Sequence, residues 1–211
     1  MQVQQVSNCK GVYNKQNVRP MKKLLLATAI GLTTATASFA ASETYVLDPS
    51  HSQIVFTYNH LGFSTGTGMF SGFDGEIQLD QADPAASSVT VSFPVKSMLT
   101  GWQERFDHLM SKDFFDAADE EMVTFVSTGI EVTGEKTAKI TGDLTLNGVT
   151  KSVVLDAVEN QVGEHPMAKT PWAGFNATTT ILRSDYNVGM FAPFVSDEVA
   201  LAISVEAMKM P

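Results

Sequence analysis

Residues 51–75 read HSQIVFTYNHLGFSTGTGMFSGFDG, and this stretch is the most informative part of the chain. Successive side chains of a β-strand point to opposite faces, so every second residue shares a face. One face of this stretch is apolar and ends in an imidazole: Ile54, Phe56, Tyr58 and His60. The other face is mainly polar. The pattern predicts a half-buried strand over residues 53–60.

Five glycines follow this strand, and they alternate with large apolar side chains. The glycines are residues 62, 66, 68, 72 and 75, and the interleaved residues include Phe63, Met69, Phe70 and Phe73. A glycine inside a strand marks a bend or a place where something approaches the backbone closely. A broad apolar face next to a glycine-aromatic strip predicts the wall of an apolar cavity.

Most of the remaining chain has the period of two that is typical of strands. Further strands are predicted at about 67–80, 89–95, 122–132, 138–146, 149–158, 173–181 and 199–207. Asn147-Gly148 predicts a type I′ hairpin turn. Long loops are expected at 160–171 and 184–197. One helix is predicted where Trp102, Phe106 and Leu109 recur at spacings of four and three.

About eight strands with short connections and one helix favour antiparallel pairing, because parallel strands need crossover connections. The predicted fold is all-β: an eight-stranded antiparallel up-and-down barrel with one short helical flap. A two-sheet sandwich is the alternative. A barrel of eight strands is either filled by its own side chains or holds one small ligand.

The first forty residues carry a targeting pattern. Met21-Lys22-Lys23 is basic, Leu24 to Thr36 is apolar, and small residues stand at 38 and 40. This order predicts a secretory signal peptide over 21–40 that is cleaved near Ala40. Residues 1–20 precede the pattern and are interpreted as a spurious extension upstream of the true start, Met21. The expected location is the periplasm.

The expected mature chain, residues 41–211, has the length of one domain. Its sequence has no cysteine, because the single one is Cys9. Nine basic residues stand against 23 acidic ones after residue 40, a net charge of −14. Such a surface repels nucleic acid, so no nucleic-acid partner is expected. Stable membrane insertion is not expected either.

The residues expected to line an apolar lumen and bind a ligand come from the strands, the helix and the second long loop. They are Ile54, Phe56, Tyr58, His60, Phe70, Trp102, Phe106, Leu109, Phe175, Ile181, Met190 and Phe191. A long hydrocarbon chain gains about 0.8 kcal/mol for each methylene it buries in such a lumen. The opposing interpretation is that these side chains fill the barrel.

Few polar residues are candidates for a chemical role. The four histidines, at 51, 60, 108 and 165, lack metal-ligand spacing, so neither a metal nor a cofactor other than a bound lipid is predicted. His60 is either a satisfied structural histidine or a contact for a ligand head group. Arg183 is a second head-group candidate, whereas Arg105 favours a surface pair with Asp107 or His108.

Two other function classes stay open at this point. One is an enzyme that acts on a lipid in the cavity with His60 as acid or base, although the Gly-x-Ser-x-Gly motif of hydrolases is absent. The other is a structural or stress-response protein that meets a partner through its acidic surface. A homodimer is possible through an edge strand near Pro94.

Several segments of the chain resemble the YceI-like, polyisoprenoid-binding family of secreted lipocalin-like proteins over Tyr45 to Met208. The matching segments, in chain order, are Asp48-Pro-Ser-His51-Ser52, Phe56 with His60, Gly68-Met-Phe70, Trp102 to Leu109 with Arg105 and His108, Asp113-Phe-Phe-Asp116, Thr124-Phe125, Gly142 to Lys151, Gly174-Phe175 and Arg183-Ser184-Asp185-Tyr186.

The resemblance implies an extended lipocalin-like barrel with a helical flap over a long apolar tunnel. It implies binding or transport of an isoprenoid or similar lipid, such as a polyprenyl phosphate, prenyl quinone or long-chain amide, and no catalytic role. The chain differs from the family pattern at one place, just after the Arg183-Ser184-Asp185-Tyr186 motif. Where the family usually has Gly soon afterwards, this chain has Asn187-Val188-Gly189 and then the apolar segment 190–194.

Overall fold

The computed structural model describes residues 42–118 and 121–211. The predicted extension (1–20) and signal peptide (21–40) lie outside these residues. The elements of the described part, in chain order, are β1 (Glu43–Leu47), β2 (Gln53–His60), β3 (Ser64–Phe70), β4 (Asp74–Leu79), β5 (Ser88–Pro94), α1 (Gln103–Met110), β6 (Met122–Gly134), β7 (Thr137–Leu146), β8 (Val149–Glu164), β9 (Pro171–Leu182) and β10 (Glu198–Lys209).

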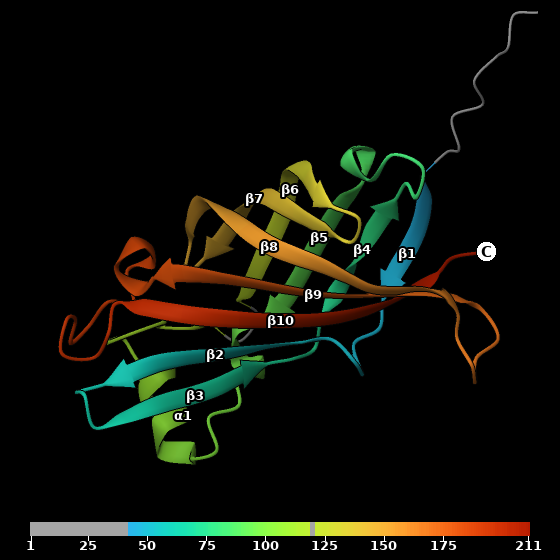
Figure 1. The fold of residues 1–211 in the computed structure, drawn as a ribbon. Helices are drawn as coiled ribbons and strands as arrows, with labels where there is room; N and C mark the ends of the chain where they lie inside the picture. The colour runs from blue at the N-terminus through green and yellow to red at the C-terminus, as the bar shows by residue number, and fades with distance from the viewer. Residues whose placement is uncertain (1–41, 119–120) are drawn as a thin grey trace, which may run out of the picture. The chain divides into compact units, whose positions relative to one another are not determined.

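The strands form a closed antiparallel barrel, as predicted (Figure 1). The ring of hydrogen-bonded neighbours runs β1-β4-β5-β6-β7-β8-β9-β10 and closes where β10 pairs with β1. All of these pairings are antiparallel. The sandwich alternative is therefore excluded for the described residues, because the sheet has no pair of separate layers.

The two strands outside this ring, β2 and β3, belong to a long hairpin that is broken at mid-length. β1 and β2 lie end to end along the same edge of β10: Leu47 is opposite Ala207, and Gln53 is opposite Ser204. In the returning arm, β3 pairs with β2 and β4 pairs with β1. The predicted strand 53–60 is β2, and the predicted strand 67–80 is divided into β3 and β4, whereas β1 is a strand that the sequence did not predict.

The break in the returning arm changes which side chains face inward. The sequence predicted one continuous strand over 67–80, which would place Phe70 and Phe73 on opposite faces. The structure ends β3 at Phe70 and starts β4 at Asp74, with Gly72 at a φ of +71° between them. Because a shift of one residue reverses the faces of a strand, both Phe70 and Phe73 now pack inside, where each ring contacts Phe93.

The glycines of β3 make room for aromatic rings on the neighbouring strand. Gly66 is opposite Tyr58, and Gly68 is opposite Phe56. A Cβ atom on either glycine would lie within 2.3 Å of the facing ring. The same device recurs at Gly142, where a Cβ would lie 2.4 Å from the ring of Phe125. These glycines therefore let aromatic rings lie flat against the sheet.

The connections agree with the sequence at one turn and differ at another. Asn147 and Gly148 both have positive φ, as a type I′ turn requires. The predicted loop 160–171 is too long: β8 continues to Glu164, and β9 begins at Pro171. A proline at the first residue of a strand is compatible with the ladder.

The single predicted helix is present as α1. Phe106 and Leu109 of α1 pack against the buried core. Among the described residues, no helix has both the length and the hydropathy needed to cross a membrane.

Candidate ligand-binding cavity

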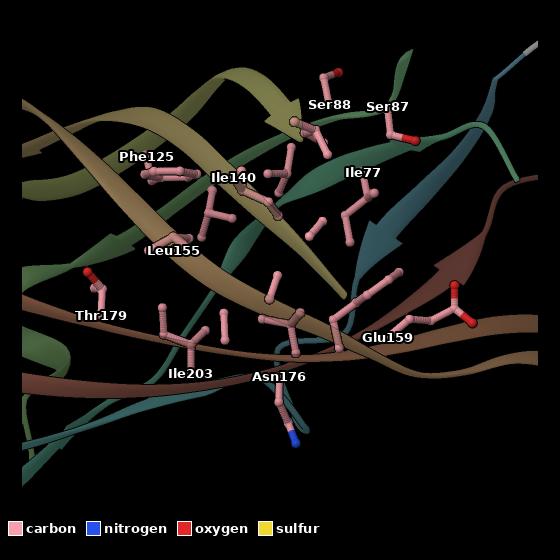
Figure 2. A pocket seen from close by; sticks show the side chains of 18 of the residues that line it. Ile77, Ser87, Ser88, Phe125, Ile140, Leu155, Glu159, Asn176, Thr179 and Ile203 are labelled. Carbon is pink, nitrogen blue, oxygen red and sulfur yellow. The ribbon is translucent and has the colours of Figure 1, made fainter. Parts of the chain in front are cut away.

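A cavity of about 440 Å³, which we call the narrow chamber, lies within the barrel strands. Its wall is mainly aliphatic and comes from the inward face of most strands, as Figure 2 shows for Ile77, Ile140, Leu155 and Ile203. Strand β10 contributes Leu201, Ile203 and Val205 to this wall. The wall also contains polar side chains, including Ser87, Ser88, Glu135, Lys136 and Glu159.

A second cavity of about 760 Å³, the wide chamber, is built from different elements. Strands β2 and β3, helix α1 and the loop after Tyr186 all contribute to its wall. Its lining is aromatic and also contains charged groups. The aromatic rings Tyr58, Phe56 and Phe70 follow one another along this wall, at centroid distances of 6.5 and 5.4 Å.

The two chambers adjoin. Four side chains line both of them and define what we call the waist: Phe70, Leu146, Ile181 and Leu201. They come from β3, β7, β9 and β10. The waist is therefore apolar on every strand that contributes to it.

The structure places ten of the twelve predicted lining residues at these walls. Ile54 and Phe175 line the narrow chamber, and Phe70 and Ile181 lie at the waist. The wide chamber has the other six: Phe56, Tyr58, His60, Trp102, Leu109 and Phe191. Phe106 packs against the core instead, and Met190 is exposed on its loop.

The sequence predicted that His60 lies inside the lumen. In the structure it lies at the mouth of the wide chamber. It is the last residue of β2, its side chain is exposed, and its backbone pairs with Val195 of the opposing loop. Its imidazole is therefore accessible both to the chamber and to solvent.

The guanidinium of Arg183 binds the backbone of the loop that follows it. Nη1 donates to the carbonyls of Val188 (2.7 Å) and Met190 (3.2 Å). Nη2 donates to Val195 (3.0 Å), and Nε donates to Ser196 (2.9 Å). A guanidinium has five N–H groups, so these bonds leave one for a head group. Burial lowers the pKa of Arg183, although nearby Asp197 opposes the effect.

Sequence reasoning missed two basic side chains of the wide chamber, Arg105 and His108. Arg105 donates from Nη1 to the Thr100 carbonyl at 3.2 Å, and the His108 ring contacts Phe114 and Phe191. After residue 40 the sequence contains only two arginines, 105 and 183, and both line this chamber. Their spacing from Trp102 and Leu109 on one helix was the signal that could have identified Arg105 and His108.

A separate polar cluster lies on the outside of the barrel, at the break between β1 and β2. His51 Nδ1 is 2.6 Å from Asp48 Oδ2. This hydrogen bond, together with the charge of Asp48, raises the pKa of His51. Burial alone would raise the pKa of Asp48, but hydrogen bonds from His51 and Ser50 outweigh burial and lower it.

Glu206 completes this cluster, and the three residues bring potential ligand atoms within 4.8 Å of one another. Each group already has a partner within the protein. Asp48 binds His51 and Ser50, while Glu206 Oε2 accepts a hydrogen bond from Trp172 Nε1 at 2.9 Å. The cluster is thus explained by the joint between β1, β2 and β10.

Comparison with known families gives a match over almost the whole barrel. The model of the YceI-like domain matches residues 45–207. The chain belongs to the YceI-like family.

Curated relatives support the same assignment. UPF0312 proteins of Pseudomonas savastanoi pv. phaseolicola and Pseudomonas fluorescens (strain SBW25) are each 40% identical to this YceI-like chain over 195 residues. The alignments cover 90% of this chain and 98% of each relative.

Solved structures have the same barrel. Burkholderia cenocepacia BcnA is 27% identical with a TM-score of 0.68, covering 76% of this chain and 99% of its own. The Campylobacter jejuni YceI protein is 31% identical with a TM-score of 0.65, covering 72% and 90%. A polyisoprenoid binding domain from Saccharophagus degradans shares the fold at 15% identity, with a TM-score of 0.62 and coverage of 81% and 100%.

The loop that departs from the usual YceI-like pattern is ordered by specific contacts. Asn187 has a φ of +60° and caps a short turn, and Gly189 lies against Ser184, where a Cβ would be 2.9 Å from its Cα. With the four bonds from Arg183, these contacts hold the loop against the mouth of the wide chamber.

Proposed function

We propose that this protein is an extracytoplasmic binding protein that sequesters or transports an isoprenoid or similar long-chain lipid. Candidate ligands are a polyprenyl phosphate, a prenyl quinone and a long-chain amide. The observation that carries the proposal is the pair of adjoining chambers, about 440 and 760 Å³, with an apolar waist between them. Small-molecule sites commonly have volumes of about 300–1,000 Å³ and few polar groups.

The dimensions of the barrel suit a long chain. Strands β6, β8, β9 and β10 have 12 to 16 residues, whereas a typical strand has about five or six. At about 3.3 Å per residue, 12 residues extend about 40 Å. A lipid tail that passes the waist would bury methylenes in both chambers, at about 0.8 kcal/mol each.

The polar groups of the wide chamber suit a head group. His60, Arg105, His108 and Arg183 all line it, whereas only Lys136 is basic in the narrow chamber. We propose that the tail occupies the narrow chamber and that the head group lies near these four side chains. Guanidinium groups bind phosphate well, and a quinone oxygen can accept from the same donors.

The proposed periplasmic location rests on the basic, apolar and small-residue pattern of residues 21–40. N-terminal sequencing of the secreted protein tests it, with Ala41 as the expected first residue. A mature protein that begins within residues 1–20 would contradict both the location and the proposed start.

Extraction and mass spectrometry of the purified protein test the binding function. We expect a co-purified prenyl or long-chain lipid, or uptake of prenyl quinone or polyprenyl phosphate by protein stripped of lipid. Failure of both would refute the proposal. Recovery of the added lipid unchanged after long incubation is expected for a binding protein, whereas a modified lipid would favour the enzyme alternative.

A further inference from the structure

We propose that one end of the barrel docks on a lipid bilayer through a rim of exposed apolar residues that surrounds the mouth of the wide chamber. The rim consists of Leu61 and Phe63 on the β2–β3 turn and Phe191 and Phe194 on the β9–β10 loop. The proposal rests on the proposed lipid-binding function, because it gives the route by which a lipid reaches the cavity.

The rim side chains are unusually exposed for their type. Phe63 is 89% exposed and Phe194 is 74% exposed. Single exposed apolar residues are common on protein surfaces, but groups of them mark interaction sites. These two phenylalanines lie on neighbouring segments, since Leu61 N donates to the Phe194 carbonyl at 3.1 Å.

The backbone holds the rim in place. Asn59 Oδ1 accepts from Gly62 N at 2.7 Å, and the Phe63 amide donates to the His60 carbonyl at 3.0 Å. In the opposing loop, Val195 N donates to the Phe191 carbonyl at 2.9 Å. Arg183 donates to the carbonyls of Met190 and Val195 in the same loop. The exposure of the rings is thus built into two ordered turns.

The rim borders the cavity directly. His60, Phe191 and Val195 line the wide chamber and belong to the same two segments as the rim. Trp102, at the start of α1, lines the chamber and is also exposed. Figure 1 shows the β2–β3 turn and the β9–β10 loop at the same end of the barrel, while the β8–β9 loop lies at the other end.

The absence of charged residues from the rim favours docking on a bilayer of uncharged lipids. The chain has a net charge of −9, yet residues 49–73 and 186–196 contain no Asp, Glu, Lys or Arg. These two runs include the whole rim. An acidic protein is repelled by anionic lipids, so the two uncharged runs of the rim are the part that can approach a bilayer closely. Aromatic side chains are also favoured at membrane interfaces.

A second copy of this chain or another protein is the competing occupant. The rim carries single rings on narrow turns rather than a broad face, and protein interfaces bury about 800 Å² on each partner. A bilayer accepts separate rings without a matching surface. The bilayer is therefore the occupant that the rim fits best.

Vesicle flotation tests the proposal. We expect the full mature protein to float with phosphatidylcholine vesicles that contain prenyl quinone. The double variant Phe63→Ser with Phe194→Ser should bind at least tenfold more weakly, which corresponds to about 1.4 kcal/mol. Adding phosphatidylglycerol should weaken binding of the wild type. The matched control is Met167→Ser, because Met167 is 84% exposed in the β8–β9 loop.

Three results would overturn docking. Wild-type protein does not float, or the double variant floats like wild type. The third is that wild type and Met167→Ser form concentration-dependent dimers and the double variant does not. The last result would assign the rim to protein contacts. Uptake of a short-chain prenyl quinone in vesicle-free solution, measured by quenching of tryptophan fluorescence, separates the two proposals. Normal uptake by the double variant with lost flotation supports docking, whereas no uptake by wild type refutes lipid binding itself.

Discussion

The narrow chamber is walled almost entirely by continuous barrel strands, whereas the wide chamber is closed by a hairpin, a helix and a loop. In the narrow chamber, main-chain ladders on every side fix the wall, and little can move without breaking hydrogen bonds. In the wide chamber, rings seated on glycines and a loop held by one arginine form the wall. The difference indicates one rigid compartment and one adaptable compartment, which under the proposed function would hold the tail and the head group.

Glycine substitutions test this contrast most strongly. At Gly75 the φ is +146°, and a Cβ would lie 2.1 Å from the Thr90 carbonyl oxygen, which is backbone of the narrow chamber wall. Gly75→Ala should lower the free energy of unfolding by about 3 kcal/mol or more, because neither strand can shift. Thermal and denaturant unfolding measure the change.

Gly68→Ala is the counterpart beside the wide chamber, where the three atoms nearest to the new Cβ all belong to the ring of Phe56. Because that ring can move into the chamber, we expect a smaller loss of about 1 kcal/mol. Gly129→Ala is the control, since no atom lies within 4 Å of its Cβ position. Equal losses at Gly75 and Gly68 would show that the two chambers are equally rigid.

Arg183→Met should loosen the wide chamber alone. Removing the guanidinium leaves four backbone carbonyls without their donor, and we expect a loss of about 2 kcal/mol in unfolding free energy. Hydrogen exchange of the loop 188–196 should speed up, while that of β7 and β8 should not. Arg105→Met is the control, because it removes one bond to Thr100 from an exposed side chain.

Ligand affinity of Arg183→Met, compared with wild type, also separates two roles of Arg183. Loss of affinity for a polyprenyl phosphate with unchanged stability would assign it to the head group. Loss of stability with a modest change in affinity is the expected result.

The waist should decide the length of tail that can bind. Ile181 lines both chambers, and Ile181→Trp fills the passage. We expect about tenfold weaker binding of a long-chain prenyl quinone and little change for a short one, measured by fluorescence titration. Thr180→Trp, on the exposed face of the same strand, is the control. Equal effects on both chain lengths would mean that the tail does not cross the waist.

The smallest expected effect concerns His51, outside both chambers. Its folded pKa is raised above 6.5 by Asp48. The stabilisation is therefore fully present below pH 6.5 and is lost as the pH rises through the folded pKa. NMR titration of the imidazole should show this raised value, and Asp48→Asn should remove most of the shift and leave only the smaller effect of Glu206. A titration midpoint at or below 6.5 would contradict the hydrogen bond.

The sequence predicted the barrel well because each strand shows the alternation of apolar and polar residues, and this signal can be recognised within a few residues. It could not locate the break at Gly72, since a bend changes the faces of a strand without changing its composition. For the same reason it left Phe70 and Phe73 on opposite faces. Arg183 shows another limit: a single arginine gives no sign of whether it binds a ligand or its own backbone. Arg105 and His108 were undervalued because their position at the wide chamber depends on how α1 packs.

The last strand of the chain has a kinetic consequence. β10 is the only described strand that joins β9, β1 and β2, so the ring stays open until residues 198–209 are available. Contacts between the first and last strands of a domain make folding slow, because a long loop must close first. The ribosome makes these residues after all the other described strands. We expect such a chain to stay unfolded until β10 has been made, a form that would suit the proposed export.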